Sequence, residues 1–221
     1  MTRRSRVIAI DGPAASGKSS TAQMVAVKLG FLHVDSGSLY RAATAAILRV
    51  EPDEAKWTEA TVLDAAGGVE LRAARTSFYP LLEEKAIEGE IRSAEVTRSV
   101  SRVAQMPRLR EWVNDLVREA ASSKDVVVDG RDMGTVVFPD ADLKIFLVAD
   151  SRERAARRLR QRGTPTSEKM LDDETIRIRE RDALDARQTV PAADAVVIDT
   201  TLLTQPEQVE QIVTLAEQRF G

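Results

Sequence analysis

Short apolar runs alternate with longer stretches of helical periodicity along the chain. The runs lack the polar alternation of a half-exposed strand, which is typical of parallel strands covered on both faces. Predicted strands occupy residues 7–10, 31–34, 126–128, 143–148 and 195–198, and predicted helices occupy residues 17–29, 39–50 and 206–219. Strands separated by helices form βαβ units, so the pattern predicts an α/β fold with a doubly wound parallel sheet of five strands.

Two segments depart from this alternation. Residues 69–90 hold Pro80 and Gly89 among short strand-like pieces, and we expect them to form an insertion on the core sheet. Residues 151–185 are dense in charge, with six arginines between positions 152 and 162. No internal repeat or low-complexity tract divides the sequence, so residues 1–221 are expected to form a single domain.

Composition and charge exclude several classes of protein. The chain has 221 residues, no cysteine and one histidine, which excludes thiol nucleophiles, disulfides and metal centres built from cysteines or several histidines. Its 32 Lys and Arg against 35 Asp and Glu give a formal charge of −3, which argues against a general nucleic-acid binder. We expect the single histidine, His33, to be packed on its short strand without a functional role.

Membrane and export signals are not expected in this sequence. The sequence contains no run of 18 apolar residues, so no transmembrane helix is expected. The N-terminus passes from basic residues straight into the first predicted strand and lacks the apolar region of a signal peptide. Together with the absence of cysteine, this predicts a cytoplasmic chain with no membrane partner.

The segment from Gly12 to Ser19, GPAASGKS, fits the phosphate-binding P-loop pattern G-x-x-x-x-G-K-[ST]. A predicted strand precedes it and a predicted helix follows, as the motif requires. The glycines let successive backbone N–H groups point inward, and the helix N-terminus adds a positive partial charge at the same point. Lys18 can bridge the β- and γ-phosphates of a nucleoside triphosphate, and the Ser19 hydroxyl can ligate Mg²⁺. The alternative is a glycine-rich turn with a surface lysine.

Two further loops follow predicted strands. The loop at 35–41, DSGSLYR, comes after the second strand, where Ser36 can cap the next helix and Arg41 can reach an anion at the helix N-terminus. The loop at 129–135, DGRDMGT, comes after the third strand. Ligands of open α/β sheets bind at the carboxyl ends of strands, so both loops should converge on the P-loop. The alternatives are an ordinary capped helix at the first loop and a surface ion pair at the second.

Five segments, taken in order, resemble the bacterial cytidylate kinases, a branch of the nucleoside monophosphate (NMP) kinases. They are IDGPAASGKSS at 10–20, DSGSLYRA at 35–42, GEIRSAEVTRSVSRVAQMPRLR at 89–110, DGRDMGTVVFPDADLKIFLVAD at 129–150 and RERDALD at 179–185. Order and spacing match from about residue 7 to residue 199, and DGRDMGTVVFPDA is the most specific segment. The resemblance implies a P-loop NTPase fold in which 36–104 form an inserted NMP-binding region and 151–185 a short helical lid.

The resemblance also implies ATP-dependent phosphorylation of CMP and dCMP to CDP and dCDP with Mg²⁺, and a set of site residues. The residues expected to hold the ATP phosphates are Gly12, Pro13, Ala14, Ala15, Ser16, Gly17, Lys18, Ser19 and Ser20, with Ser19 as the Mg²⁺ ligand. The residues expected around the monophosphate are Ser36, Gly37, Tyr40, Arg41, Ser101, Arg110, Arg131, Asp132, Arg181 and Asp185. Lys18, Arg131 and Arg181 would be catalytic, because phosphoryl transfer mainly requires neutralised charge and aligned substrates.

The chemistry of these side chains agrees with cytosine as the base. Cytosine carries an N4 amino donor beside the N3 and O2 acceptors, so Asp132 can accept from the amino group while Arg110 and Ser101 donate to the acceptors. Uracil has a carbonyl at position 4, which Asp132 would repel. Arg181 and Asp185 lie four residues apart and therefore share one face of a helix.

Several positions keep two interpretations. Arg157 and Arg158 either close over ATP with the lid or belong to a solvated charged helix. Asp129 either holds a Mg²⁺-bound water or only forms a turn. Many family members carry an arginine at the position of Gln188, so a phosphate contact is missing there unless Arg187 supplies it.

Three functions stay open on the sequence alone. They are a kinase for CMP, a P-loop kinase for another small acceptor such as UMP, AMP or a metabolite like shikimate, and a non-catalytic nucleotide-binding module. Asp132, Arg110 and Ser101 favour the first over the second, and the presence of Lys18 and Ser19 argues against the third. We expect a monomer whose partners are the small molecules CMP, dCMP and ATP.

Overall fold

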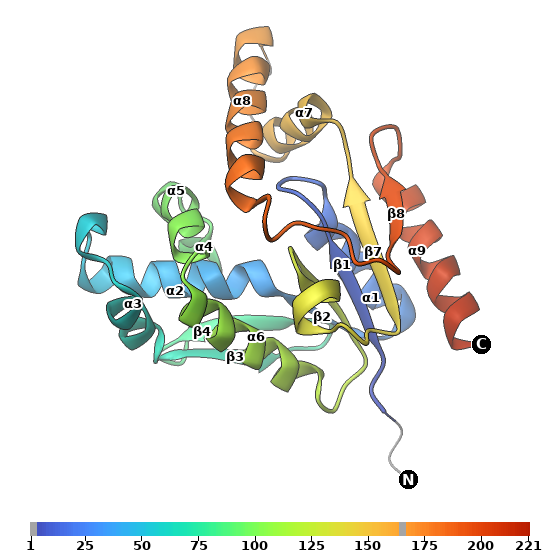
Figure 1. Cartoon of the computed structure of the whole chain (residues 1–221), viewed down its shortest axis with the longest axis horizontal. Helices are drawn as coiled ribbons and strands as arrows, with labels where there is room; N and C mark the ends of the chain where they lie inside the picture. Colours follow the sequence, from blue (N-terminus) through green and yellow to red (C-terminus); the bar gives the residue numbers. More distant parts are fainter. Residues whose placement is uncertain (1–3, 164–166) are drawn as a thin grey trace.

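A computed structural model, which describes residues 4–163 and 167–221, shows a five-stranded parallel sheet with helices on both faces (Figure 1). The strands of this sheet are β1 (Val7–Asp11), β2 (Leu32–Asp35), β6 (Val126–Gly130), β7 (Leu143–Val148) and β8 (Val196–Asp199). They lie in the order β2-β6-β1-β7-β8, and every pairing is parallel. The predicted α/β class and doubly wound sheet are confirmed.

Four long helices cover the two faces of this sheet. They are α1 (Lys18–Leu29), α2 (Ser36–Val50), α6 (Pro107–Ala121) and α9 (Gln205–Phe220). Successive residues of a strand face opposite sides, so Ile8 and Ile10 of β1 pack with α1 and α9, whereas Val7 and Ala9 pack with α2 and α6. Because both faces are buried, the strands read as apolar runs in the sequence.

The segment between α2 and α6, here called the insertion, includes residues 69–90 and lies beside the edge strand β2 (Figure 1). Its elements are a 3₁₀ turn η1 (Glu54–Lys56), α3 (Glu59–Ala66), β3 (Val69–Ala73), β4 (Phe78–Leu82), β5 (Lys85–Ala86), α4 (Glu88–Ile91) and α5 (Ala94–Val103). The three strands form an antiparallel sheet of their own. The backbone N–H of His33 donates to Thr76 O at 3.1 Å, which joins the insertion to the main sheet.

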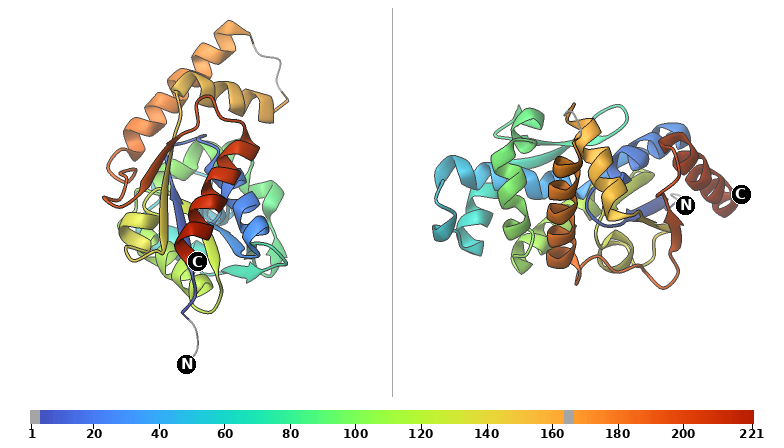
Figure 2. Two further views of the ribbon diagram at one scale, coloured as in Figure 1. Left: turned by 90° about the vertical axis from the view of Figure 1, so that its right-hand side faces the viewer. Right: turned by 90° about the horizontal axis from the view of Figure 1, so that it is seen from above.

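Two charged helices stand above the carboxyl edge of the main sheet (Figures 1 and 2). They are α7 (Ser151–Gln161) and α8 (Glu168–Asp185), and they pack against each other. A short π-helical turn, η2 (Met133–Val137), follows β6. The region predicted as a lid, 151–185, includes residues 164–166, which lie outside the described residues.

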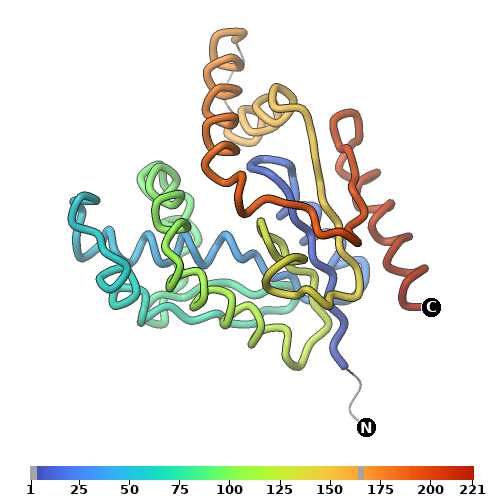
Figure 3. The backbone as a smooth tube through the Cα atoms, viewed as in Figure 1, coloured from blue at the N-terminus to red at the C-terminus, as the bar shows by residue number. Residues whose placement is uncertain are grey.

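The start of β1 and the end of α9 lie on the side of the molecule opposite to α7 and α8 (Figure 3). There the Arg6 guanidinium lies over two adjacent aromatic rings, 4.7 Å from the centre of Phe31 and 4.9 Å from that of Phe220, and the two ring centres are 5.9 Å apart. Its guanidinium also donates to Asp125, from Nη2 at 2.7 Å and from Nε at 3.0 Å. Arg6 therefore connects the start of β1 to the end of α9.

Candidate active site

The loops after β1, β2 and β6 converge at the carboxyl edge of the sheet, as predicted. Arg131 Nη1, in the third loop, donates to Gly12 O in the first at 3.1 Å. Ser36 Oγ, at the start of α2, donates to Asp129 O at 2.8 Å. A Cβ atom on Gly130 would lie 2.6 Å from that Ser36 hydroxyl, so glycine is required for the second and third loops to meet.

The structure corrects one detail of the second loop. The helix α2 begins at Ser36, three residues earlier than predicted, and Asp35 caps it by accepting from Ser38 N at 3.2 Å. The prediction that Ser36 caps this helix is wrong, because its hydroxyl donates to Asp129 instead. Ser36 and Gly37 thus form the first turn of α2 at the edge of the site.

The P-loop wraps from β1 into α1, and basic side chains hold three of its consecutive carbonyl groups. Gly12 O accepts from Arg131, Pro13 O from Lys18 at 2.9 Å and Ala14 O from Arg154 at 2.8 Å. Gly17 caps α1 with φ 88°, a left-handed conformation that favours glycine. These contacts fix the loop in place before any phosphate is bound.

The donors of the P-loop fit a phosphate group and Mg²⁺. The buried hydroxyl of Ser16 has no hydrogen-bond partner within the described residues, so it can serve a phosphate oxygen. Ser19 Oγ donates to Asp129 Oδ2 at 2.6 Å, which places two hard oxygen donors side by side. Mg²⁺ is usually held by one or two protein oxygens together with substrate phosphates. Over 4–163 and 167–221 no group of three or more His, Cys, Asp or Glu residues forms a separate metal centre.

Lys18 and its neighbours are buried charges at the base of the P-loop. Burial, followed by the charge of Arg131, lowers the pKa of Lys18 to about 7, and Asp129 opposes this shift. Burial also raises the pKa of Asp35 to about 6, and the Asp129 carboxylate acts in the same direction. A bound polyphosphate would favour charged Lys18, because an anion close to an ammonium group stabilises its protonated form.

Asp129 lies within β6 and is paired on both sides, so the interpretation of Asp129 as only a turn residue is wrong. Its carboxylate is 1% exposed, and each oxygen has a partner: Oδ2 accepts from Ser19, and Oδ1 lies 2.6 Å from His33 Nε2. Sequence reasoning gave His33 no role, because its partner is 96 positions away along the chain. Only the parallel pairing of β2 with β6 brings the two side chains together.

Arginines gather where the loops after β2 and β6 face α8. Arg131 Nε lies 3.1 Å from Asp185 Oδ2, and Arg181 Nε lies 3.6 Å from the same oxygen. Burial lowers the pKa of Arg181, with Arg131 adding to the shift, and burial followed by Arg181 lowers the pKa of Arg41 to about 10. Such a group of crowded cations with one buried counter-charge suits a dianionic phosphate.

Asp132, which follows Arg131 in the sequence, forms an ion pair with Arg110. The Arg110 guanidinium lies 5.8 Å from the ring centre of Tyr40, whose buried hydroxyl has no hydrogen-bond partner in the described part of the chain. Arg110 Nη1 also donates to Gln188 Oε1 at 2.9 Å. Gln188 therefore faces the predicted base-binding pair, whereas the neighbouring Arg187 is exposed.

Ser101 stands apart from the other predicted base-binding residues. It lies on α5 and is partly buried, and no hydrogen bond joins it to Arg110 or Asp132 within the described residues. A neighbouring serine of the same helix, Ser99, donates instead to Glu54 of the insertion at 2.6 Å. A role for Ser101 in binding cytosine stays a prediction.

The two arginines predicted to belong to a lid point to different partners. Arg158 Nε lies 3.2 Å from Glu174 Oε1 on α8. Arg157 donates to Thr200 Oγ1 at 3.1 Å, beside the end of β8. Contact of either with ATP stays a prediction.

Sequence reasoning missed Arg154, which is 6% exposed and links the P-loop to α8. Besides donating to Ala14 O, it forms an ion pair with Asp182 at 2.7 Å. Asp182 Oδ1 in turn accepts from Ala14 N at 3.3 Å. Arg154 lies in an arginine-rich helix where exposed and buried arginines look alike in sequence, so only its tertiary contacts distinguish it.

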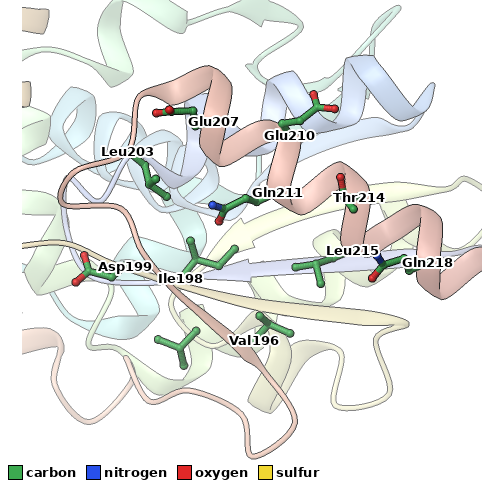
Figure 4. Close-up of a pocket in the computed structure, with 11 residues that line it drawn as sticks. Val196, Ile198, Asp199, Leu203, Glu207, Glu210, Gln211, Thr214, Leu215 and Gln218 are labelled. Carbon is green, nitrogen blue, oxygen red and sulfur yellow. The ribbon is translucent and has the colours of Figure 1, made fainter.

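A groove of about 750 Å³ lies between β8 and α9, outside this cluster (Figure 4). Ile198, Leu203 and Leu215 are among its lining residues, and none of the lining residues belongs to the predicted site. None of the described helices is long and apolar enough to cross a membrane.

The parallel sheet, the P-loop between β1 and α1 and the cluster of arginines beside it are those of a P-loop kinase. The cytidylate kinase family model matches residues 8–218, and the chain belongs to this family, as the sequence motifs predicted.

Relatives of known name agree with this assignment. A cytidylate kinase of Desulfitobacterium hafniense is 42% identical over 221 residues, covering 94% of this chain and 91% of the relative. One from Oceanobacillus iheyensis is 39% identical, covering 93% and 91%, and one from Vibrio cholerae is 38% identical, covering 100% of both chains. Among solved structures, TT1252 from Thermus thermophilus has a TM-score of 0.50 at 14% identity and covers 99% of this chain and 100% of its own, which shows the fold alone.

Proposed function

We propose that the protein transfers the γ-phosphoryl group of ATP directly to CMP or dCMP, forming CDP or dCDP. The observation that carries this proposal is the Asp132–Arg110 pair. Asp132 directly follows Arg131, whose guanidinium reaches the P-loop at Gly12. A group that can read a base and a group that can hold a triphosphate therefore belong to one continuous site.

Asp132 and Arg110 suit the edge of cytosine. The carboxylate only accepts hydrogen bonds, and cytosine N4 is a donor, whereas the Arg110 guanidinium only donates and cytosine N3 and O2 are acceptors. Uracil presents a carbonyl in place of the amino group, so it would leave Asp132 facing another acceptor. This pattern favours CMP over UMP as the acceptor.

Charge neutralisation is the main task left to the protein in phosphoryl transfer. Lys18, Arg131 and Arg181 would neutralise the transferring group, while Arg41 would bind the acceptor phosphate. When bound to Ser19, Mg²⁺ would neutralise the β- and γ-phosphate oxygens of ATP. Alignment of the two nucleotides would be provided by the P-loop on one side and the arginines on the other.

We assign residues 36–104 to binding of the monophosphate and residues 151–185 to a lid over ATP. A lid protects the γ-phosphate from water, and its charged surface is suited to a polyanion. We further propose that the protein acts as a monomer in the cytoplasm, on small molecules only, without nucleic-acid or membrane partners.

A coupled-enzyme assay of ADP release tests this function. ATP is supplied with CMP, dCMP, UMP, AMP or shikimate, and wild-type protein is compared with an identically prepared Lys18→Ala variant, which reports any contaminating kinase. We expect kcat/KM for CMP or dCMP to exceed that for UMP and AMP by several orders of magnitude. A base that leaves a buried polar group of the site without a hydrogen-bond partner is strongly rejected. Equal or greater activity on another acceptor would refute the assignment to CMP.

A further inference from the structure

His33 is the only histidine of the chain and it is buried, 7% exposed, beneath the phosphate-binding site. Its Nε2 lies 2.6 Å from Asp129 Oδ1. The other carboxylate oxygen, Oδ2, accepts from Ser19 Oγ at 2.6 Å. The three side chains form a continuous line from the edge strand β2, through β6, to the first turn of α1.

The backbone of His33 is held on both sides of its strand. On one side β2 pairs with β6, with His33 opposite Val127 and Asp35 opposite Asp129. On the other side His33 N donates to Thr76 O, and His33 forms a bridge with Ser77 of the insertion. A ring anchored in this way is a rigid support for the carboxylate that it contacts.

The direction of these hydrogen bonds determines what Ser19 offers to a metal ion. A carboxylate accepts only, so both His33 Nε2–H and the Ser19 hydroxyl donate to Asp129. Because the Ser19 hydroxyl donates its hydrogen bond to Asp129, the lone pairs of its oxygen remain available to coordinate a cation. Rotation of the Asp129 carboxylate would disturb this arrangement, and the contact with His33 opposes that rotation.

We propose that His33 is a positioning residue that acts through Asp129 to orient Ser19 as a ligand of the Mg²⁺ bound with ATP. This inference rests on the proposed ATP-dependent function. Partners that hold metal ligands in place commonly contribute 10- to 100-fold to metal affinity. The loss of His33 should therefore weaken Mg²⁺-dependent ATP binding and leave CMP binding unaffected.

The test uses three substitutions in the full chain. His33→Phe keeps a buried ring and removes the donor, and His33→Leu removes the donor with a smaller aliphatic side chain in case the phenylalanine ring is not accommodated. His33→Gln keeps an N–H donor at a similar reach. Asn114→Leu is the matched control, because Asn114 is also a buried polar residue, on α6, and its Oδ1 has no partner within the described residues.

Calorimetry without turnover gives the readout. ATP is titrated into each protein with Mg²⁺ and again with EDTA, in the absence of CMP, and CMP is titrated separately. We expect the ratio of ATP affinities, with and without Mg²⁺, to fall about 10- to 100-fold in His33→Phe and His33→Leu. The ratio should stay within about threefold of wild type in His33→Gln and Asn114→Leu. This result would show that the loss in the other two variants comes from removal of the His33 N–H donor. CMP affinity should be unchanged in all four variants.

Two results would overturn the proposal. An unchanged ratio in a folded His33→Phe or His33→Leu protein would leave His33 as a packing residue. A ratio that falls equally in His33→Gln would mean that the N–H donor is not what supports Asp129. If instead wild-type protein binds ATP with Mg²⁺ but does not phosphorylate CMP, the proposed function fails while the role of His33 in metal binding stands.

Discussion

Asp132 forms an ion pair with Arg110, which joins the loop after β6 to the first turn of α6. The side chains of the pair are only 8% and 16% exposed. Gln188 supports the pair by accepting a hydrogen bond from the same guanidinium. An acceptor and a donor are thus held side by side at one wall of the site, which is the arrangement that a cytosine edge requires.

Replacing Asp132 by Asn should weaken the discrimination between bases. The amide has the same shape and can present either an oxygen to cytosine or an NH₂ group to uracil. We expect the ratio of kcat/KM for CMP to that for UMP to fall about 10- to 100-fold, in line with the ~1–3 kcal/mol of an unsatisfied buried group. Both substrates are assayed on one preparation. Asp115→Asn, an exposed carboxylate on α6, is the control. An equal loss for CMP and UMP would make Asp132 a scaffold residue.

Lys18→Ala should act mainly on turnover. Charge on the transferring oxygens grows in the transition state, so a preorganised cation contributes most there. We expect kcat to fall by about 10²-fold or more, with a smaller change in the Kd for ATP measured by calorimetry. Lys28→Ala, at the exposed end of the same helix, should leave both constants unchanged. Turnover near the wild-type rate in Lys18→Ala would contradict the assignment of the P-loop.

Asp11 should make stability depend on pH between about 4 and 6. Burial raises its pKa from 3.8 to about 6, although the N–H groups of Met133 and Gly134 lower it. Between these values the folded state keeps a proton that the unfolded state has lost, so the stability contributed by the protonated group falls as pH rises.

Urea unfolding at several pH values tests this dependence against Asp11→Asn, which does not titrate. The difference in unfolding free energy, wild type minus variant, should fall by about 2 kcal/mol from pH 4 to pH 6, because one pKa unit corresponds to 1.36 kcal/mol and the group is still partly protonated in the folded state at pH 6. The pKa of Asp35 is raised in the same direction, but it is common to both proteins and cancels. A difference that does not change with pH would show that Asp11 titrates normally.

Arg6→Met should lower thermal stability without affecting catalysis. The substitution removes the cation that lies over the rings of Phe31 and Phe220, together with its hydrogen bonds to Asp125. Losing about 1–2 kcal/mol should reduce Tm by about 2–8 °C in a chain of this length. Scanning calorimetry measures the shift, and Arg72→Met, an exposed arginine of β3, should not reproduce it. A changed kcat in Arg6→Met would mean that this distant contact reaches the active site.

The sequence by itself determined the sheet, the P-loop and the family. The apolar runs of β1, β6 and β7 are readable because parallel strands buried on both faces admit few polar residues. The P-loop is readable because its glycines, lysine and serine must stand at set spacings within one short segment. Local constraints of this kind leave a pattern in neighbouring residues, and that pattern survives without knowledge of the fold.

Only the tertiary structure decided which distant side chains meet. Nothing around His33 signals its contact with Asp129, because strand pairing over 96 positions creates it. Arg154 is buried against Ala14, whereas Arg152, on the same helix, is exposed and pairs with α8, although both belong to one run of charge. Gln188 meets Arg110 across 78 positions. Hydrogen bonds and ion pairs depend on separations of a few ångströms between side chains, and these separations are set by the packing of whole elements.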